Sequence, residues 1–244
     1  MLGQDNLLNE NWSNFVVLLG EWGSGKKTLI KNKFKDIYNT ENNIDGVREV
    51  IRDAQKLTNS RLYLFNIDEM TYQAQNALLK ITEEPPNEYT YIVIIGTSRE
   101  QFLPTILSRA DIKEMNIYTK EQLLNFTDNE EYLKFYNQPG LLLETNEEIV
   151  EFAQKIVIGL SKITVANVFN IKNYIEELDT NLILLIKPLK YYMRFDYEIV
   201  QAISKFEYLL SRRGLNFVLD NMFLELFTLF RKSEFKDIIL KGVK

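Results

Sequence analysis

Three short apolar runs constrain the fold of this chain more than any other feature. They lie at Phe15–Leu19, Leu62–Ile67 and Tyr91–Ile95, and each is rich in β-branched or aromatic residues and ends in a loop signal. Apolar runs without polar alternation are typical of strands that are covered on both faces, as in a parallel sheet. Because the segments between the runs have helical periodicity, the pattern predicts an α/β fold with loops at the carboxyl ends of the strands.

Helical patterns follow these runs and then take over the second half of the chain. The predicted helices of the first half are Lys26–Asp36, Val47–Leu57 and Thr71–Glu83. Thr71 is a candidate N-cap for the last of them, and Pro85 is a stop signal. After about Tyr118 the strand signals fade, and the clearest helix is Leu215–Phe230, with apolar residues three and four positions apart. The C-terminal half is therefore predicted to be all-helical.

Composition excludes several classes of function. The chain has 244 residues, of which 45% are hydrophobic and 26% charged, the balance of a soluble globular protein. It has no cysteine and no histidine, which excludes disulfides, a zinc site and a Ser-His-Asp hydrolase. A net charge of −5 provides no global positive field, so any DNA contact must be local or shared with partners. No apolar stretch approaches the roughly 18 residues of a membrane span, so we expect a cytoplasmic protein without a membrane partner.

A glycine-rich stretch, GEWGSGKKT, follows the first apolar run and precedes a helical pattern. It matches the phosphate-binding pattern G-x-x-x-x-G-K-[ST] at every fixed position except the last, where Lys27 stands. In such a loop the backbone N–H groups surround phosphates, the lysine reaches the β- and γ-phosphates, and the following hydroxyl ligates Mg²⁺. The candidate cofactor-binding residues are Gly20, Gly23, Ser24, Gly25, Lys26, Lys27 and Thr28.

Lys27 changes what this loop is expected to do. An ammonium group has no lone pair for a metal, and two unit charges about 4 Å apart repel by roughly 4 kcal/mol at an effective dielectric of 20. Magnesium binding is therefore expected to be poor unless Lys27 points away and Thr28 takes its place. ATP remains a possible cofactor, because nucleotide binding survives this change more readily than hydrolysis does.

Two acidic residues, Asp68 and Glu69, follow the second apolar run. In ATPases with a phosphate-binding loop, such an aspartate orders Mg²⁺ and such a glutamate polarises the attacking water. A pair of acidic residues after a strand is by itself often a solvated turn. Its position after the loop favours the catalytic interpretation.

The segment from Gln75 to Ile112 carries a family resemblance. Its sequence, QNALLKITEEPPNEYTYIVIIGTSREQFLPTILSRADI, resembles the run NALLK-x-x-EEPP, a strand ending in Thr, and LP-x-TI-x-SRC of the bacterial clamp-loader subunits, the delta prime and gamma/tau subunits of DNA polymerase III. The segments IDGVREVIRDAQKL, LGQD and GLNFVLDNMFLELF resemble further parts of the same family. The resemblance covers most of the chain and is densest over Ile44–Ile112.

The resemblance implies an AAA+ module of the P-loop class with two helical parts after it. We expect an α/β nucleotide-binding-like domain at 1–117, a small helical lid at 118–145 and a helical collar for oligomerisation at 146–244. The implied partners are other clamp-loader subunits in an open ring, the sliding clamp and primed DNA within the complex.

Two more site residues come from the resemblance alone. Thr97 corresponds to the sensor position at the end of the third strand. Arg109 corresponds to the arginine of the Ser-Arg-Cys motif, which in the family reaches the ATP site of the neighbouring subunit and acts in trans. Ala110 stands in place of the motif's cysteine, a small-for-small change that leaves this role intact.

Two departures from the family pattern favour a reduced, impaired member. The four-cysteine zinc module is absent, so no zinc is expected. In the lid, NQPGLLLE resembles the family's GSP/LR-x-AL, but Gly140 falls where motor subunits keep a second sensing arginine. The change at Gly140 agrees with that at Lys27, since each removes a group that contacts the nucleotide's phosphates or its metal.

The sequence therefore favours a clamp-loader subunit of the delta prime type, which presents Arg109 to a neighbour while its own ATPase is impaired. An active motor ATPase of the gamma/tau type is the alternative, with Lys26, Asp68 and Glu69 active and Thr28 as metal ligand. A stand-alone nucleotide-binding regulator is a third hypothesis, but it leaves the NALLK to SRA run unexplained.

Overall fold

The computed structural model describes residues 3–162, 181–210 and 215–243, without the side chains of 210 and 215–220. It forms two compact units. The first, here called the sheet unit, comprises Met1–Asp128 and Gln138–Gly140; the second, the helical unit, comprises Asn129–Asn137 and Leu141–Lys244. The division into domains at 1–117, 118–145 and 146–244 stays a prediction.

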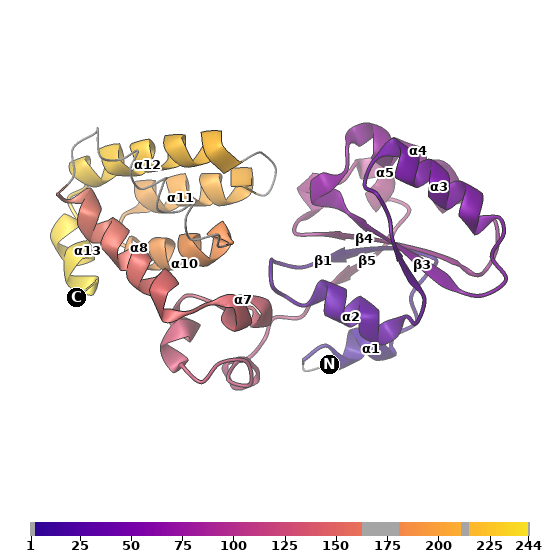
Figure 1. The fold of residues 1–244 in the computed structure, drawn as a ribbon, viewed down its shortest axis with the longest axis horizontal. Coiled ribbons are helices and arrows are strands. Elements are labelled where there is room, and N and C mark those ends of the chain that lie inside the picture. Colours follow the sequence, from indigo (N-terminus) through magenta and orange to yellow (C-terminus); the bar gives the residue numbers. More distant parts are fainter. Residues whose placement is uncertain (1–2, 163–180, 211–214, 244) are drawn as a thin grey trace. The chain divides into compact units, whose positions relative to one another are not determined.

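The sheet unit alternates strands and helices along the chain (Figure 1). Its strands are β1 (Phe15–Leu19), β2 (Ile37–Asn39), β3 (Arg61–Asn66), β4 (Thr90–Gly96) and β5 (Asp111–Glu114). Its α-helices are α1 (Asp5–Asn9), α2 (Lys26–Lys33), α3 (Ile44–Ala54), α4 (Tyr72–Glu83), α5 (Pro104–Leu107) and α6 (Lys120–Leu123), and its short 3₁₀ helices are η1 (Ile67–Glu69) and η2 (Arg99–Gln101).

The strands form one parallel sheet in the order β2-β3-β4-β1-β5. β4 therefore lies between β3 and β1, with Val17 of β1 opposite Ile94 and Leu64 of β3 opposite Val93. This arrangement confirms the predicted α/β fold. It also brings the segments that follow β1, β3 and β4 to the same edge of the sheet.

Both faces of the sheet are covered by helices, which explains the apolar runs without alternation. On one face, β1, β3 and β4 contribute alternate residues to a core with α3, α4 and α5: Phe15, Val17, Leu19, Tyr63, Phe65, Ile92 and Ile94. The intervening residues form the other core, with α1 and α2: Val16, Leu18, Leu62, Leu64, Val93 and Ile95. Within α4, Ala74, Leu78 and Ile81 are buried, and the Thr71 hydroxyl accepts a hydrogen bond from the Ala74 N–H at 3.2 Å as the predicted N-cap.

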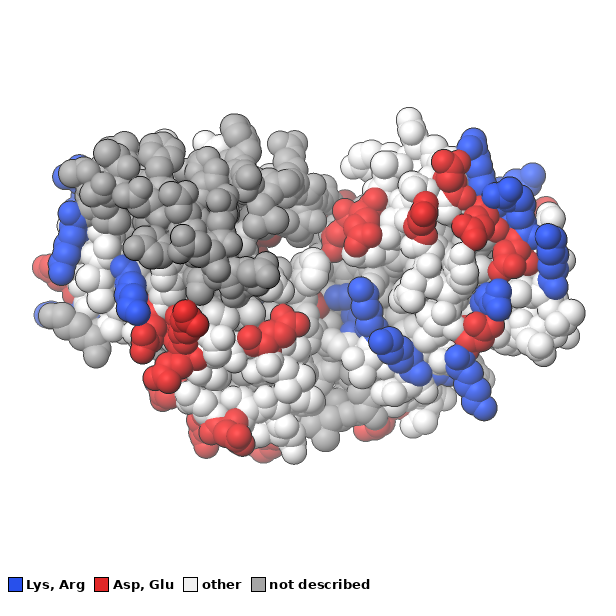
Figure 2. Space-filling view, in the orientation of Figure 1, with Lys and Arg blue, Asp and Glu red and all other residues white. Residues whose placement is uncertain are grey.

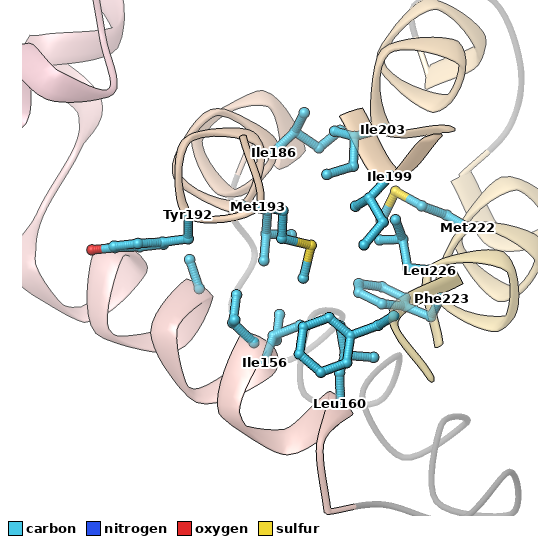
Figure 3. Packing of buried hydrophobic residues seen from close by; sticks show 14 of the residues in the cluster. Ile156, Leu160, Ile186, Tyr192, Met193, Ile199, Ile203, Met222, Phe223 and Leu226 are labelled. Atoms are coloured by element: carbon cyan, nitrogen blue, oxygen red, sulfur yellow. The ribbon is translucent and has the colours of Figure 1, made fainter. Parts of the chain in front are cut away.

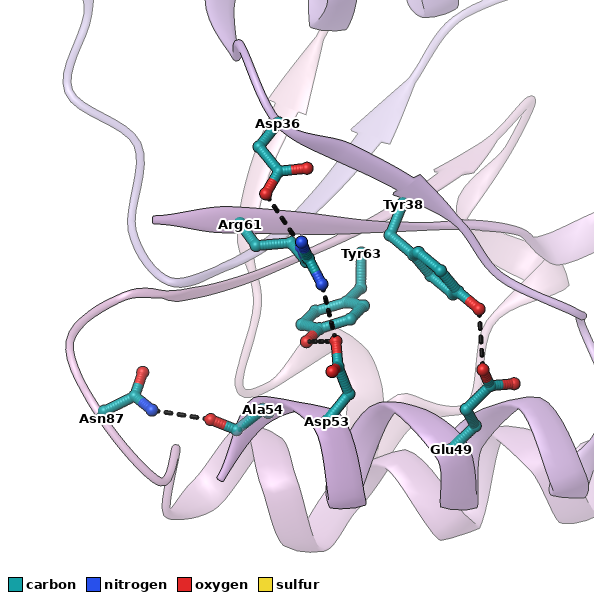
Figure 4. Close-up of polar contacts among 8 residues, drawn as sticks. All are labelled: Asp36, Tyr38, Glu49, Asp53, Ala54, Arg61, Tyr63 and Asn87. Carbon is teal, nitrogen blue, oxygen red and sulfur yellow. Dashed lines mark hydrogen bonds and ion pairs between the residues drawn. The ribbon is translucent and has the colours of Figure 1, made fainter. Parts of the chain in front are cut away.

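A polar network attaches α3 to the sheet (Figure 4). Arg61, at the start of β3, donates to Asp36 at 2.9 Å and to Asp53 of α3 at 3.0 Å. The Tyr63 hydroxyl also donates to Asp53, at 2.7 Å, and this bond is the main cause of a lowered pKa of the Asp53 carboxyl. In the middle of the same helix, Glu49 accepts a hydrogen bond from the Tyr38 hydroxyl at 2.7 Å.

Several elements differ from the sequence prediction: α3 covers Ile44–Ala54 instead of Val47–Leu57, and α1 and α5 were not predicted. β2 and β5 were not predicted, because they have only three and four residues and are partly exposed edge strands. α2 ends at Lys33 instead of Asp36 because Phe34 takes an extended backbone, with a φ of −116°. The Phe34 ring packs on Trp12 and Tyr91, with ring centroids 5.8 and 5.5 Å away.

The described part of the helical unit contains only helices, as predicted (Figure 1). They are η3 (Glu130–Lys134), α7 (Pro139–Glu144, whose first two residues belong to the sheet unit), α8 (Glu147–Leu160), α10 (Leu182–Tyr192), α11 (Tyr197–Leu210), α12 (Leu215–Lys232) and α13 (Lys236–Gly242). Buried apolar side chains from α8, α10, α11 and α12 meet in one core (Figure 3). Met222, Leu226 and Phe230 bury the predicted face of α12, whereas Leu215, Val218 and Leu219 lie outside the described side chains. No helix in the described ranges is both long and apolar enough to cross a membrane.

Pro188 lies inside α10, where it removes one backbone hydrogen bond. The carbonyl left without its helical donor is that of Leu184, four residues earlier. The Tyr136 hydroxyl donates to this carbonyl at 2.7 Å. Burial raises the pKa of Tyr136 to about 12, so the hydroxyl keeps its proton at neutral pH. A tyrosine outside the helix thus replaces the donor that the proline lacks.

We expect Tyr136→Phe to lower the free energy of unfolding of the helical unit by roughly 1–3 kcal/mol, because it leaves the buried Leu184 carbonyl unpaired. The same substitution made together with Pro188→Ala should cost less, since an alanine in place of the proline restores an N–H donor. Urea unfolding followed by circular dichroism of the wild type, the two single variants and the double variant measures this coupling. Additive effects of the two substitutions would contradict the pairing.

Candidate functional site

The glycine-rich loop joins the end of β1 to the start of α2. The Gly20 N–H continues the sheet by donating to the Gly96 carbonyl at 3.1 Å. Gly23 and Gly25 have φ values of +75° and +88°, a left-handed backbone that favours glycine. Because Gly25, the N-cap of α2, has no side chain that could accept a hydrogen bond, the first turn of the helix presents backbone donors as an anion-binding loop does.

Lys26 is turned inward onto its own loop. Its ammonium donates to the Gly20 carbonyl at 2.5 Å and to the Glu21 carbonyl at 3.0 Å. Burial lowers the pKa of Lys26 to about 8; the charges of Asp68 and Glu21 oppose this shift, and the charge of Lys27 adds to it. The lysine that would reach a phosphate is therefore occupied by backbone carbonyls.

Lys27 and Thr28 both lie in exposed positions on α2. Figure 2 shows Lys or Arg side chains on the molecular surface over this helix. Thr28 is thus an exposed residue of the helix, and its role as a substitute metal ligand stays a prediction. The Ser24 hydroxyl is buried and has no hydrogen-bond partner among the residues that the structure describes.

Asp68 and Thr97 are joined by a residue that the sequence did not single out, Gln101. Its Nε2 donates to the Asp68 carboxylate. Its Oε1 accepts from the Thr97 N–H at 2.8 Å, from the Thr97 hydroxyl at 2.9 Å and from the Ser98 N–H at 3.1 Å. Gln101 is buried, and it closes a capping box with Ser98 at the start of η2. The predicted acidic and sensor residues are therefore close together, as expected from the adjacent ends of β3 and β4.

Glu69 lies beside Asp68 in η1 but has different partners. Its carboxylate accepts from Asn42 at 2.6 Å and from Asn66 at 2.9 Å. Asn42 also accepts the Asn66 N–H at 2.7 Å, which fixes both amides around the carboxylate. Neither asparagine stood out in the sequence, because only their position beside η1 gives them a role.

Arg109 lies far from these residues, at the end of the sheet where the strands begin. It follows α5 and precedes β5, whose first residue, Asp111, pairs with Val16 near the start of β1. Arg109 contributes to the lining of a cavity of about 200 Å³ together with Ser13 and Asn14, just before β1. Since the glycine-rich loop follows the end of β1, the length of this strand separates Arg109 from the loop.

The Arg109 guanidinium is held in place but remains accessible. It donates to the Thr105 carbonyl at 2.9 Å and forms an ion pair with Glu83 of α4 at 2.5 Å. Its side chain is 34% exposed, enough for one edge of the guanidinium to meet a group from outside the unit.

Gly140 contacts the glycine-rich loop directly. Its N–H donates to the Gly23 carbonyl at 2.8 Å. Two residues earlier, the Gln138 side chain donates to the Glu21 carboxylate at 2.7 Å. The Tyr118 hydroxyl donates to the Ser24 carbonyl at 2.8 Å. The family resemblance marks Gly140 as the place of a missing arginine, but neither its contact with Gly23 nor the role of Gln138 is evident in the sequence.

Several known proteins are similar to parts of this chain. A family profile described as "DNA polymerase III, delta subunit" matches residues 9–118. The DNA polymerase III subunit delta' of Buchnera aphidicola subsp. Baizongia pistaciae is 31% identical over 126 residues, 52% of this chain and 31% of that protein. The subunit delta' of Haemophilus influenzae is 27% identical over 176 residues, 63% of this chain and 53% of that protein. The chain thus spans between 31% and 53% of the length of these curated relatives.

A solved structure confirms the fold class. The DNA polymerase III gamma subunit-related protein from Thermotoga maritima aligns with 98% of this chain and 98% of its own, with a TM-score of 0.57 and 18% sequence identity. At that identity the likeness concerns the fold alone. It agrees with an α/β fold that has a helical C-terminal part.

The lowered pKa of Lys26 predicts how stability depends on pH. The unfolded chain keeps the ordinary lysine pKa of 10.5, so between pH 8 and 10.5 it binds more protons than the folded chain, and the free energy of unfolding rises with pH. We expect the free energy of unfolding of the wild type to rise over this pH range by roughly 2 kcal/mol more than that of the Lys26→Met variant. Urea unfolding followed by tryptophan fluorescence measures it, because Trp12 and Trp22 both lie in the sheet unit. Parallel pH curves for the two proteins would contradict the shift.

Proposed function

We propose that this chain, which the family profile and the named relatives support as a member of the DNA polymerase III clamp-loader family, is a subunit of the delta prime type. In this proposal it occupies one place in a ring with other clamp-loader subunits, which act on a sliding clamp and primed DNA. It supplies Arg109 to the ATP site of a neighbour, and its own ATPase is impaired.

The separation of Arg109 from the chain's own loop carries this proposal. An arginine beyond the start of β1 cannot reach a nucleotide held beyond the end of β1, so any phosphate that it stabilises belongs to another subunit. Its partial exposure and its planar, permanently charged guanidinium suit contact with phosphate oxygens. The ion pair with Glu83 orients the side chain until that contact forms.

The chemistry of the loop residues supports an impaired site. The glycine-rich backbone and Lys26 suit the phosphates of ATP. A magnesium ion fits less well, because Lys27 occupies the hydroxyl position and Thr28 is exposed. We therefore propose at most metal-poor nucleotide binding, with no hydrolysis of its own.

The active gamma/tau-type motor remains the second candidate. The acidic pair Asp68 and Glu69 and the loop glycines are all present, and this observation favours it. The exposure of Thr28 opposes it, because the substitute hydroxyl would have to turn inward. A stand-alone nucleotide-binding regulator gains no support from relatives that are named as polymerase subunits.

We expect Arg109→Ala to reduce ATP hydrolysis severalfold in the assembled complex, because a fixed positive charge at the neighbour's site is lost. The isolated chain should unfold as the wild type does. Steady-state turnover of the reconstituted complex, with clamp and primed DNA, measures the effect.

Glu83→Gln is the matched control for this experiment. It removes the same ion pair but leaves the guanidinium, so the complex should keep its turnover. Equal losses in both variants would mean that Arg109 acts only through the structure of its own unit. Unchanged turnover in Arg109→Ala would exclude a role in trans.

We expect the isolated chain to hydrolyse ATP negligibly, with or without Mg²⁺, because the loop lacks its metal-ligating hydroxyl. Phosphate release over hours, compared with the Glu69→Gln variant, provides the measurement. Robust turnover that disappears in Glu69→Gln would instead identify an active motor.

A further inference from the structure

The segment Gln138–Gly140 lies directly on the glycine-rich loop and contacts it at two points. The Gly140 N–H donates to the Gly23 carbonyl at 2.8 Å. The Gln138 amide donates to the Glu21 carboxylate at 2.7 Å, a bond that is strengthened by the charge of the acceptor. Both contacts lie within the sheet unit, so one compact body holds the loop and the segment together.

The absence of a side chain at Gly140 makes the first contact possible. A Cβ atom at this position would lie 2.8 Å from the Gly23 Cα and 3.0 Å from the Gly23 carbonyl oxygen. Those are backbone atoms, which cannot move aside as the end of a flexible side chain does. Any residue other than glycine must therefore push the segment away from the loop.

The contact leaves no room for a ligand group between the two backbones. A direct hydrogen bond joins Gly23 to Gly140, and nothing can be inserted without breaking it. On the inner side of the loop, Lys26 is bonded to the Gly20 and Glu21 carbonyls. Lys26, the side chain that would reach a phosphate, is thus engaged with carbonyls of its own loop, and the segment lies against the loop backbone at Gly23.

We propose that Gln138–Gly140 hold the phosphate-binding loop closed and that Gly140 is the residue that permits this closure. A nucleotide must displace the segment before its phosphates can enter the loop. This inference deepens the proposed impairment of the chain's own site, because it adds a steric barrier to the missing metal ligand. It does not depend on the role of Arg109.

The closed arrangement leaves two buried polar atoms unpaired in the described part of the chain. The Ser24 hydroxyl in the loop and Gln138 Oε1 in the segment are both buried and lack a hydrogen-bond partner within the described ranges. Each unpaired group disfavours the closed arrangement. The hydrogen bond from Gly140 to Gly23 and the charge-assisted bond from Gln138 to Glu21 favour it.

Two substitutions test the closure by different means. Gly140→Ala introduces the Cβ that collides with the loop backbone. Gln138→Glu keeps the shape of the side chain but sets a carboxylate against Glu21, so it opens the contact through charge repulsion. Gly242→Ala is the control, because a Cβ at Gly242 meets no atom within 4 Å. Circular dichroism establishes that each variant is folded.

Hydrogen–deuterium exchange of the full chain, read by mass spectrometry for peptides covering the loop and residues 138–142, measures closure without any ligand. We expect exchange to become about tenfold faster in Gly140→Ala and Gln138→Glu, the change that corresponds to the loss of one hydrogen bond. Gly242→Ala should exchange as the wild type does. If Gly140→Ala does not fold, Gln138→Glu still decides the result.

Titration with a fluorescent ADP analogue, without metal, measures how closure affects the affinity for nucleotide. We expect both variants to bind it several times more tightly than the wild type does. Unchanged exchange in both variants would overturn the closure, and faster exchange without a gain in binding would overturn its role as a barrier. Tight binding by the wild type itself would instead contradict the proposed impairment, so the two failures are distinguishable.

Discussion

The pairing of β4 with both β1 and β3 is the constraint on which the candidate site depends. Because the three strands are parallel and adjacent, the glycine-rich loop, η1 and Thr97 all follow strand ends at one edge. Polar side chains help to set the register. A shift of β3 by one residue would turn Tyr63 to the face covered by α1 and α2, away from Asp53. The position of η1, which follows β3, therefore depends on a register that the Tyr63–Asp53 contact helps to set.

Much of this fold was predictable from the sequence, and the misses have physical causes. The three central strands and α4 were predictable because burial on both faces, or on one helix face, leaves a pattern of apolar residues. β2 and β5 left no such pattern, since edge strands of three or four residues bury little. α10 continues through Pro188 because Tyr136, distant in sequence, supplies the lost donor. Such long-range compensation is invisible in any local window.

The candidate site was predictable in its chemical groups but not in their partners. Motif spacing and the family resemblance predicted the loop, Asp68 and Thr97, whereas the bridging role of Gln101 depends on the adjacency of β3 and β4. The described polar groups of the site form hydrogen bonds mainly with one another. A ligand would therefore exchange existing bonds for new ones, and the net gain from binding would be smaller than the number of its contacts suggests.

The edges of the sheet have a consequence for how this protein can associate. β2 and β5 are short, and Lys113 of β5 forms ion pairs with Glu10 and with Asp111. Edge strands that are short and charged resist pairing with strands from other chains. The sheet is thus protected from growing into a continuous intermolecular sheet. Any assembly of this chain must be mediated by helices and loops, whose side chains can distinguish one neighbour from another, whereas backbone pairing would accept almost any strand.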